Sequence, residues 1–364
     1  MNKIRKLSCA TAARLAFAFI LFACAGTGRG VAAQQSQNSV KEYQRFANGV
    51  EMLHVQGNVY MIAGAGANIT VQVGSQFVFV VDSGLPQMSE QVLAAIRTVT
   101  DKQGILFIID TCADADHTGG NENLSKAGWA LPNSSSQPLQ KTGGSEGGLG
   151  GLAPIPGASI LGHINVLNAM SQPSGNAPKI PDTLWPTDVY ESKYWRLYND
   201  EGVFMYHAPN AHSDGDTYVL FRGSDVMSTG DIVNLLSYPV IDPKHGGSID
   251  GLIDALNKII ELLEPKSNEE GGTYIVPGHG HIGDRHDVVN YRDMVTVVRD
   301  RVRNLIRKGK TLEEVKAAKP TFEYDGLYGA TSGPWTTSMF VEAIYRDLSK
   351  TTSRQEQKVS GGLR

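Results

Sequence analysis

Four short polar clusters, each following an apolar strand-like segment, constrain the fold of this chain more than any other feature. They are Cys-Ala-Asp-Ala-Asp-His at 112–117, the segment around His212, the segment ending at Asp231, and the turn around His279. A lone His or Asp in a loop more often caps a helix or faces solvent. Strand ends on one side of a sandwich can converge, so four such clusters in order indicate a single site built by two sheets.

The segments between these clusters alternate between strand patterns and helix patterns. Residues 58–64, 68–74 and 76–84 are β-branched and aromatic runs separated by Gly, which predicts an antiparallel meander. The apolar run at 105–110 predicts a strand buried on both faces. Helices are predicted at 89–99, 159–170, 249–264, 287–308 and 337–348, and a capping box at Thr311 predicts a further short helix. Further strands are predicted at 202–208, 216–223, 225–231 and 273–280. This order predicts an α/β (α+β) fold, in which two similar halves pack as one αββα sandwich.

The polar clusters resemble the metal motifs of the metallo-β-lactamase-fold superfamily. Its first motif is His-x-His-x-Asp-His, and its later ligands are a His, a bridging Asp and a final His. The resemblance runs from about Asn58 to His279, and Asp82 in VVDSG matches the structural Asp turn of the family. The gaps of 19 residues from His212 to Asp231, and of 48 from there to His279, are similar to the family's. The phrases HAPNAHSDGD and IDPKHGGSIDGLI resemble an exported bacterial branch labelled as metallo-hydrolases.

The resemblance implies ligands for two metal ions. One ion is held by the residues that match Asp116, His117 and His279, with Asp231 bridging to the other ion, and all four are present. In such sites a metal-bound hydroxide attacks the substrate, and we expect Asp116 or Asp231 to orient that nucleophile as the catalytic carboxylate. The resemblance therefore implies that this second metal site is intact.

The first site departs from the family pattern, because Cys112 and Asp114 stand where two His are expected to join His212. A thiolate and a carboxylate are competent Zn²⁺ ligands, and in an extended loop positions 112, 114 and 116 point the same way. Both side chains are shorter than His, so an ion held by all three must lie closer to the backbone, or the loop must move.

Charge is the second consequence of the altered motif. Two Zn²⁺, one hydroxide and two carboxylates sum to a formal charge of about +1, and a further thiolate and carboxylate bring it to about −1. A less positive cluster stabilises hydroxide less well. We therefore expect one tightly held Zn²⁺ and a weaker second site, with iron as the alternative metal.

Three functions are compatible with these residues. The leading hypothesis is a metal-dependent hydrolase that acts on an ester, thioester, lactone or amide of a small molecule. The rival is a catalytically weak or inactive binding protein that keeps the sandwich, because a fold does not imply a function. The third is an iron or redox site that uses Cys112. No residue pattern identifies the substrate, its binding residues or the oligomeric state.

Other His residues near the clusters have two readings each. His207 lies five residues before His212 and either lines the pocket or makes a structural hydrogen bond. His281 and His286 flank the turn at His279 and either support the ligands through hydrogen bonds or face solvent.

The first 33 residues predict an export signal. Basic residues precede an apolar run at 15–25, and the small residues of VAAQ predict cleavage after Ala33. The run is too short for a spanning helix, so no stable membrane span is expected. The stretch LFAC resembles a lipoprotein signal that ends at Cys24, but Phe22 is bulky where such signals prefer a small residue. We expect an exported, periplasmic or secreted protein, with lipid anchoring as the alternative.

Removal of this segment changes the charge and the cysteine count. The remainder has 28 Lys and Arg against 37 Asp and Glu, or −9 instead of −4, which disfavours nucleic-acid binding. Cys9 and Cys24 are lost with the signal, so only Cys112 remains and no internal disulfide can form. The expected regions after the signal are a lead-in at 34–57, a metallo-β-lactamase-like domain at 58–282 with a Gly/Ser/Pro-rich insertion at 131–157, a C-terminal helical extension at 283–350 and a polar tail at 351–364.

Overall fold

The computed structural model describes most of the chain beyond the predicted export signal. The described residues are 43–45, 49–100, 103–130, 155–172, 179–268 and 271–361, with the side chains of 43–45, 155 and 351–361 left aside. The export signal and residues 131–154 of the predicted insertion lie outside this part of the chain. No helix within the described residues is both long and apolar enough to cross a membrane.

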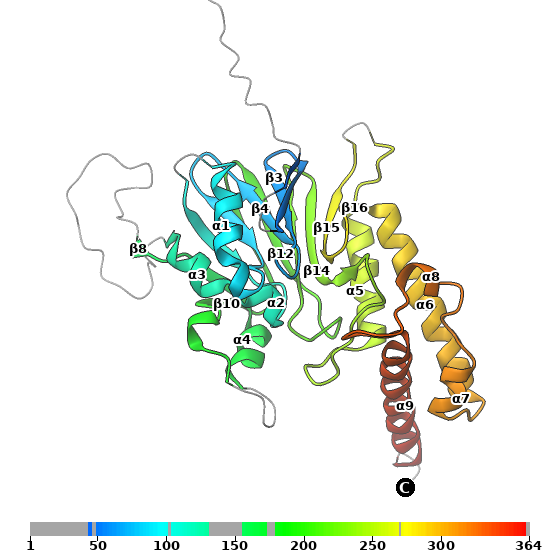
Figure 1. Ribbon diagram of the computed structural model, residues 1–364. Helices are drawn as coiled ribbons and strands as arrows, with labels where there is room; N and C mark the ends of the chain where they lie inside the picture. The colour runs from blue at the N-terminus through cyan, green and yellow to red at the C-terminus, as the bar shows by residue number, and fades with distance from the viewer. Residues whose placement is uncertain are drawn as a thin grey trace, which may run out of the picture. The chain divides into compact units, whose positions relative to one another are not determined.

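Two β-sheets face each other at the centre of the described chain (Figure 1). The first sheet has eight strands in the order β1-β2-β3-β4-β5-β6-β9-β10, antiparallel from β1 to β5 and parallel from β5 to β10. Its strands are β1 (Tyr43–Arg45), β2 (Glu51–Gln56), β3 (Val59–Ala63), β4 (Ile69–Val73), β5 (Val78–Val81), β6 (Ile105–Ile109), β9 (Ser159–His163) and β10 (Asp188–Tyr190). The predicted meander over 58–84 is confirmed.

The second sheet has six strands in sequence order, antiparallel except for the parallel pair β14–β15. Its strands are β11 (Lys193–Tyr198), β12 (Glu201–His207), β13 (Thr217–Phe221), β14 (Val226–Asn234), β15 (Tyr274–His279) and β16 (Gly283–Asp284). A separate short pair, β7 (Trp129–Ala130) and β8 (Ile155–Pro156), flanks the undescribed part of the insertion.

Helices flank the two sheets in the described chain. They are α1 (Ser89–Arg97), α2 (Ala115–Thr118), α3 (Asn121–Lys126), α4 (Ile164–Ser171), α5 (Ile249–Leu262), α6 (Arg285–Arg307), α7 (Leu312–Ala317), α8 (Asp325–Tyr328) and α9 (Thr337–Gly361), with single 3₁₀ turns at η1 (Pro86–Met88) and η2 (Asp182–Leu184). The capping box predicted at Thr311 is present, because Thr311 and Glu314 exchange side-chain and backbone hydrogen bonds at the start of α7. A second capping box, between Asp284 and Asp287, starts α6 two residues before the predicted position.

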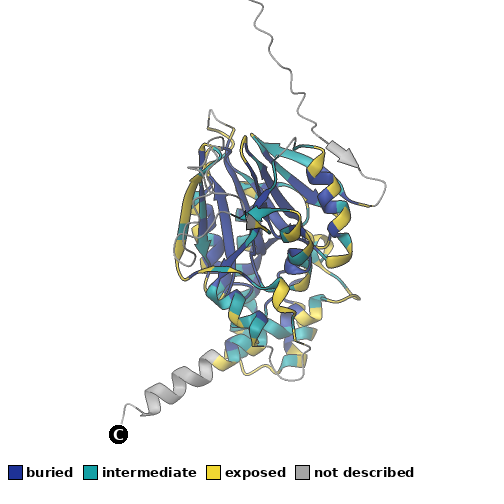
Figure 2. Cartoon of the chain, turned by 90° about the vertical axis from the view of Figure 1, so that its left-hand side faces the viewer, coloured by how far each residue is buried: buried dark blue, intermediate teal, exposed yellow. Residues whose placement is uncertain are grey.

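Three apolar clusters separate four layers of structure, and the buried residues in Figure 2 follow both sheets. One cluster joins α1 to the first sheet, one lies between the sheets, and one joins the second sheet to α5, α6 and α9. Within β5, Val78 and Val80 face α1 while Phe79 and Val81 face the second sheet, as the alternation of a strand buried on both faces requires. The predicted αββα arrangement is confirmed.

One predicted helix is partly wrong. Residues 159–163 form β9 instead of the start of a helix, and α4 begins only at Ile164. The strand is inserted between β6 and β10 as a parallel neighbour of both, and its ladder hydrogen bonds replace those of a helical turn. His163 then caps α4, because its Nδ1 accepts a hydrogen bond from the backbone of Asn165. Tertiary pairing overrides the helical spacing here.

Candidate metal centre

The loop after β6 brings the altered motif to the edge where the two sheets meet. Its backbone joins the second sheet, since the Thr217 amide of β13 donates a hydrogen bond to the Thr111 carbonyl at 2.8 Å. Asp114 is extended and precedes the short helix α2. The motif therefore splits into two groups of donor atoms, in each of which all donors lie within 4.8 Å of one another. These groups are Cys112, Asp114 and His212, and Asp116, His117 and His279.

The second group has the spacing of a single coordination sphere. Asp231 Oδ1 lies 3.4 Å from the Nε2 atoms of both His117 and His279, and His279 Nε2 lies 3.4 Å from Asp116 Oδ2. Two ligands of a tetrahedral Zn²⁺, each about 2.0–2.1 Å from the ion, lie about 3.3–3.4 Å apart. β14 supplies Asp231 and the end of β15 supplies His279. The structure thus brings together all four ligands that the sequence predicts for this ion.

Unpartnered buried atoms show that this donor set fits a cation. His117 Nε2 and Asp231 Oδ1 are buried and have no hydrogen-bond partner among the described residues. An unsatisfied buried polar atom costs about 1–3 kcal/mol, more when it is charged, and an ion between these atoms would offset that cost.

Asp82 orients the His117 ring. Its Oδ2 accepts from His117 Nδ1 at 2.8 Å, which leaves the Nε2 lone pair to face the site. Both carboxylate oxygens of Asp82 also accept from the Thr111 hydroxyl. Asp82 has a φ of 63°, in the left-handed region that Asp tolerates better than most residues. Burial alone would lower the pKa of His117, but the neighbouring Cys112, Asp82 and Asp231 raise that pKa well above its ordinary value. The surroundings therefore favour a cation at Nε2, which is a proton in the absence of metal and can be a metal ion in its place.

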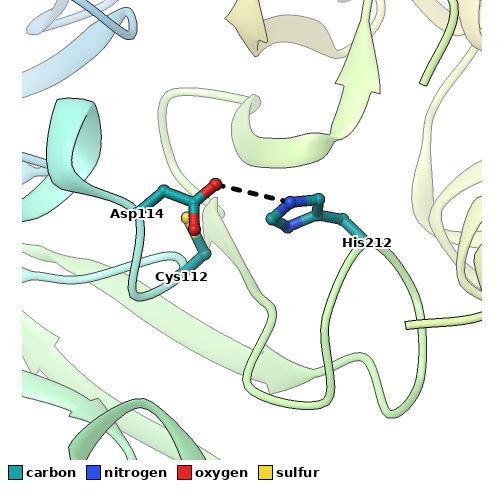
Figure 3. Close-up of side chains that lie close together, drawn as sticks. All are labelled: Cys112, Asp114 and His212. Atoms are coloured by element: carbon teal, nitrogen blue, oxygen red, sulfur yellow. Dashed lines mark ion pairs between the residues drawn. The ribbon is translucent and has the colours of Figure 1, made fainter. Parts of the chain in front are cut away.

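The first group is drawn in Figure 3, where the Cys112 sulfur and the Asp114 carboxylate lie on the same side of the loop, toward the His212 ring. His212 Nε2 lies 3.5 Å from Asp114 Oδ2 and has no hydrogen-bond partner among the described residues. Cys112 is buried as a free thiol, and Asp114 is partly exposed. The loop thus brings Cys112 and Asp114 close to His212, although both of these side chains are shorter than the His expected at their positions.

Asp216 orients His212 and was not among the predicted site residues. Its Oδ1 lies 3.3 Å from His212 Nδ1, and the Ser213 amide and hydroxyl donate to the same carboxylate at 2.8 and 2.6 Å. Burial alone would lower the pKa of His212, but Asp216 and the other nearby carboxylates raise it to about 10. The signal in the sequence was an Asp four residues after the His in HSDGD.

The remaining His residues lie outside the two groups. The His207 ring stacks on that of His163 at 3.6 Å, and its Nε2 is 2.8 Å from the Asp214 carbonyl, so His207 has the structural role among its two predicted readings. The side chains of His281 and His286 are exposed, and no ligand is among their hydrogen-bond partners in the described chain.

One cavity approaches the centre from the side of α4. A cavity of about 270 Å³ reaches Asp114 and is lined by polar side chains that include Asn165, Asn168, Gln172 and Lys244. The larger cavity of about 760 Å³ lies in the C-terminal helices, between α7, α8 and α9, and none of the predicted ligands lines it. Of these two cavities, only the smaller one reaches a predicted ligand.

Known structures share this architecture at low sequence identity. The stereoselective inverting sec-alkylsulfatase Pisa1 from Pseudomonas sp. superposes with a TM-score of 0.54 and 14% identity, over 81% of this chain and 49% of that one. This chain thus spans about half the length of the sulfatase. The DIM-1 metallo-β-lactamase (TM-score 0.47, 15% identity, 70% of this chain and 99% of that one) and a metallo-β-lactamase from Pontibacter korlensis (0.45, 12%, 70% and 98%) are also similar. No protein-family model and no curated protein sequence matches the chain.

The sulfatase similarity concerns the fold, and it agrees with the four layers and with the motif loops that meet at one sheet edge. The predicted resemblance is confirmed at that level. The chain has the metallo-β-lactamase fold, with the first metal motif altered from His-x-His-x-Asp-His to Cys-x-Asp-x-Asp-His.

Proposed function

We propose that the protein is a metal-dependent hydrolase of a small molecule. The observation that carries the proposal is the set of converging donors on His117, His279 and Asp231, two of which are buried and have no hydrogen-bond partner in the described chain. An ion held there, with Zn²⁺ as the proposed metal, would supply a Lewis acid and an activated water. Asp116 and His279 remain partly exposed, so this donor set is accessible from solvent.

The carboxylates of Asp116 and Asp231 have different proposed roles. The hydrogen bond from His279 lowers the pKa of Asp116, so this partly exposed group is ionised at neutral pH and can accept a proton at the rim. Asp231 lies deeper. Burial would raise its pKa, but His117 and His212 lower it below its ordinary value. We assign proton transfer and orientation of the attacking water to Asp116, and anchoring of the two rings to Asp231.

The proposed substrates are esters, thioesters, lactones and amides. Because the structural neighbour Pisa1 is named as a sec-alkylsulfatase, sulfate esters belong in the same panel. The cavity beside Asp114 is lined by amide side chains and Lys244, which favours a polar substrate. No residue in it selects one of these bonds.

The test is turnover of this panel by the full chain after chelation and after reloading with Zn²⁺. We expect chelation to remove the activity and Zn²⁺ to restore it. The His279→Ala variant should have only background activity. His286→Ala is the matched control, since His286 is exposed and no metal-site residue is among its described hydrogen-bond partners. Zn²⁺-loaded protein without turnover on any member of the panel would contradict the proposal.

A second candidate is a binding protein without efficient catalysis, which the replacement of two His by Cys112 and Asp114 favours. Restoring both with Cys112→His and Asp114→His removes two anions and raises the formal charge of a two-zinc hydroxide cluster by about two. A hydrolase should then gain activity at neutral pH, whereas a binding protein should gain none. Activity of the double variant against the same panel separates the two candidates.

We also propose that the chain is exported and cleaved after Ala33, as the signal pattern at 1–33 indicates. The mature protein should begin at Gln34 in a mass analysis of its N-terminus. A lipidated product that begins at Cys24 would contradict this.

A further inference from the structure

We infer that Cys112, Asp114 and His212 form a metal site that contains a thiolate ligand and prefers a thiophilic ion. The centre then consists of two chemically different metal sites. The neighbouring group of Asp116 and His279 offers only oxygen and nitrogen donors together with His117. The inference rests on the proposed function and deepens it, because it names the ligand chemistry of the altered site. Its test does not use turnover.

The geometry of the three donors supports the site. They come from two separate loops, yet their donor atoms lie within 4.8 Å of one another. His212 is 1% exposed, and its Nε2 points toward Asp114 with no hydrogen-bond partner in the described chain (Figure 3). A buried ring nitrogen of this kind, held from behind by Asp216, is the arrangement seen at metal-binding His residues.

The surroundings of Cys112 argue against a simple packing role. A buried Cys usually fills a small apolar space. Cys112 is 1% exposed but belongs to none of the three apolar clusters of the described chain. Donor atoms of Asp114 and His212 lie within 4.8 Å of its sulfur instead. This is the environment of a ligand.

Ligand chemistry then sets the preference. Thiolate donors favour Zn²⁺, Cu⁺ and similar soft or borderline ions, whereas carboxylate and imidazole donors also accept harder ions such as Fe²⁺ and Mn²⁺. Binding at the first group would release the thiol proton and compensate a thiolate that is costly to bury alone. The second group has no thiol, so the two sites should differ in metal preference.

Cobalt(II) titration of the metal-free, reduced full chain tests the inference, because a cobalt–thiolate bond gives a near-ultraviolet charge-transfer band that nitrogen and oxygen ligands do not give. We expect this band in the parent chain. Cys112→Ser should abolish it and leave the visible cobalt bands of the second site. His279→Ala should weaken the second site and leave the charge-transfer band in place.

Cys112→His is the companion variant, since it restores the family residue and keeps a ligand at this position. It should bind cobalt without the charge-transfer band, and far-ultraviolet circular dichroism confirms that each variant is folded. Cobalt bound without a thiolate band in the parent, or an unchanged spectrum in Cys112→Ser, would overturn the inference. A thiolate band in a chain that hydrolyses nothing would refute the proposed function alone. Turnover without the band would refute this inference alone.

Discussion

Two buried carboxylates perform the same task at the two donor groups. Asp82 accepts from His117 Nδ1 at 2.8 Å, and Asp216 lies 3.3 Å from His212 Nδ1. Each fixes a ring so that the Nε2 lone pair faces the other donors, and such partners usually contribute about 10–100-fold to metal affinity. The centre therefore depends on residues that never touch the ion.

Asp82→Asn tests this dependence at one residue. Asn also tolerates the left-handed backbone at this position, so the turn should survive while the charge beneath His117 is lost. We expect metal affinity to fall by about 10–100-fold in a competition titration. Asp225→Asn is the control, because Asp225 also has a positive φ but pairs with Arg222 instead of a ligand. Equal affinity in both variants would show that Asp82 only shapes its turn.

The sequence identified the proposed metal ligands better than the residues that support them. His117, Asp231 and His279 were predicted from a motif whose spacing is specific, and the structure brings them together. Asp216 was missed because an Asp in a loop has many ordinary roles, and only its position behind the His212 ring distinguishes it. The conformation of the loop from His212 to Asp216 places that carboxylate behind the ring, and the residue types alone do not specify this conformation.

At the scale of elements, the parallel pair β14–β15 positions two of the ligands. Asp231 lies within β14 and His279 ends β15, and the strands run so close that Gly278 has no room for a side chain. A Cβ there would lie 2.3 Å from Asp231 Oδ1 and 2.7 Å from the backbone carbon of Gly230. The Gly in the VPGHG turn is therefore required by the close approach of the two strands.

Gly278→Ala should displace the Asp231 carboxylate or separate the two strands. Overpacking of this kind costs about 1–3 kcal/mol, so we expect a lower unfolding midpoint in denaturant together with weaker metal binding. Gly326→Ala is the matched control, since Gly326 lies in α8 with no atom within 4 Å of the added Cβ. A Gly278→Ala protein as stable as the parent, with full metal affinity, would contradict this account of the pair.

Element boundaries show where sequence reasoning failed and why. The strand β9 was read as helix because its apolar residues continue those of α4, and only its neighbours β6 and β10 decide between the two conformations. The start of α7 was predicted correctly, since Thr311 carries a local capping signal. Local signals were thus readable, whereas choices made by strand pairing were not.

At the scale of the whole molecule, each donor group is completed only when the two sheets pack together. The loop after β6 supplies Asp116 and His117 from the first sheet, and β14 and β15 supply Asp231 and His279 from the second. A hydrogen bond from the Asn68 side chain to the Pro277 carbonyl, at 3.0 Å, ties the sheets together beside the site. We therefore expect metal binding to be coupled to folding through the sheet interface.

Removal of the metal should lower the stability of the described fold as a unit. An ion that binds only the folded chain stabilises it by about 2.7 kcal/mol when its free concentration is 100 times its Kd. We expect chelation to lower the melting temperature in calorimetry and added Zn²⁺ to restore it, with a smaller effect in His279→Ala. A melting temperature that neither chelation nor added Zn²⁺ changes would mean that the sheets pack independently of any ion.

The central claim is that Asp116, His117, Asp231 and His279 hold one ion tightly while the altered first group holds a second ion less tightly. Elemental analysis of the purified, tag-free chain, combined with a competition titration, tests it most directly. We predict about one tightly bound ion per chain, which His279→Ala loses and Cys112→Ser keeps. A chain that binds no metal after reconstitution, or a His279→Ala variant that retains the tight ion, would contradict the account.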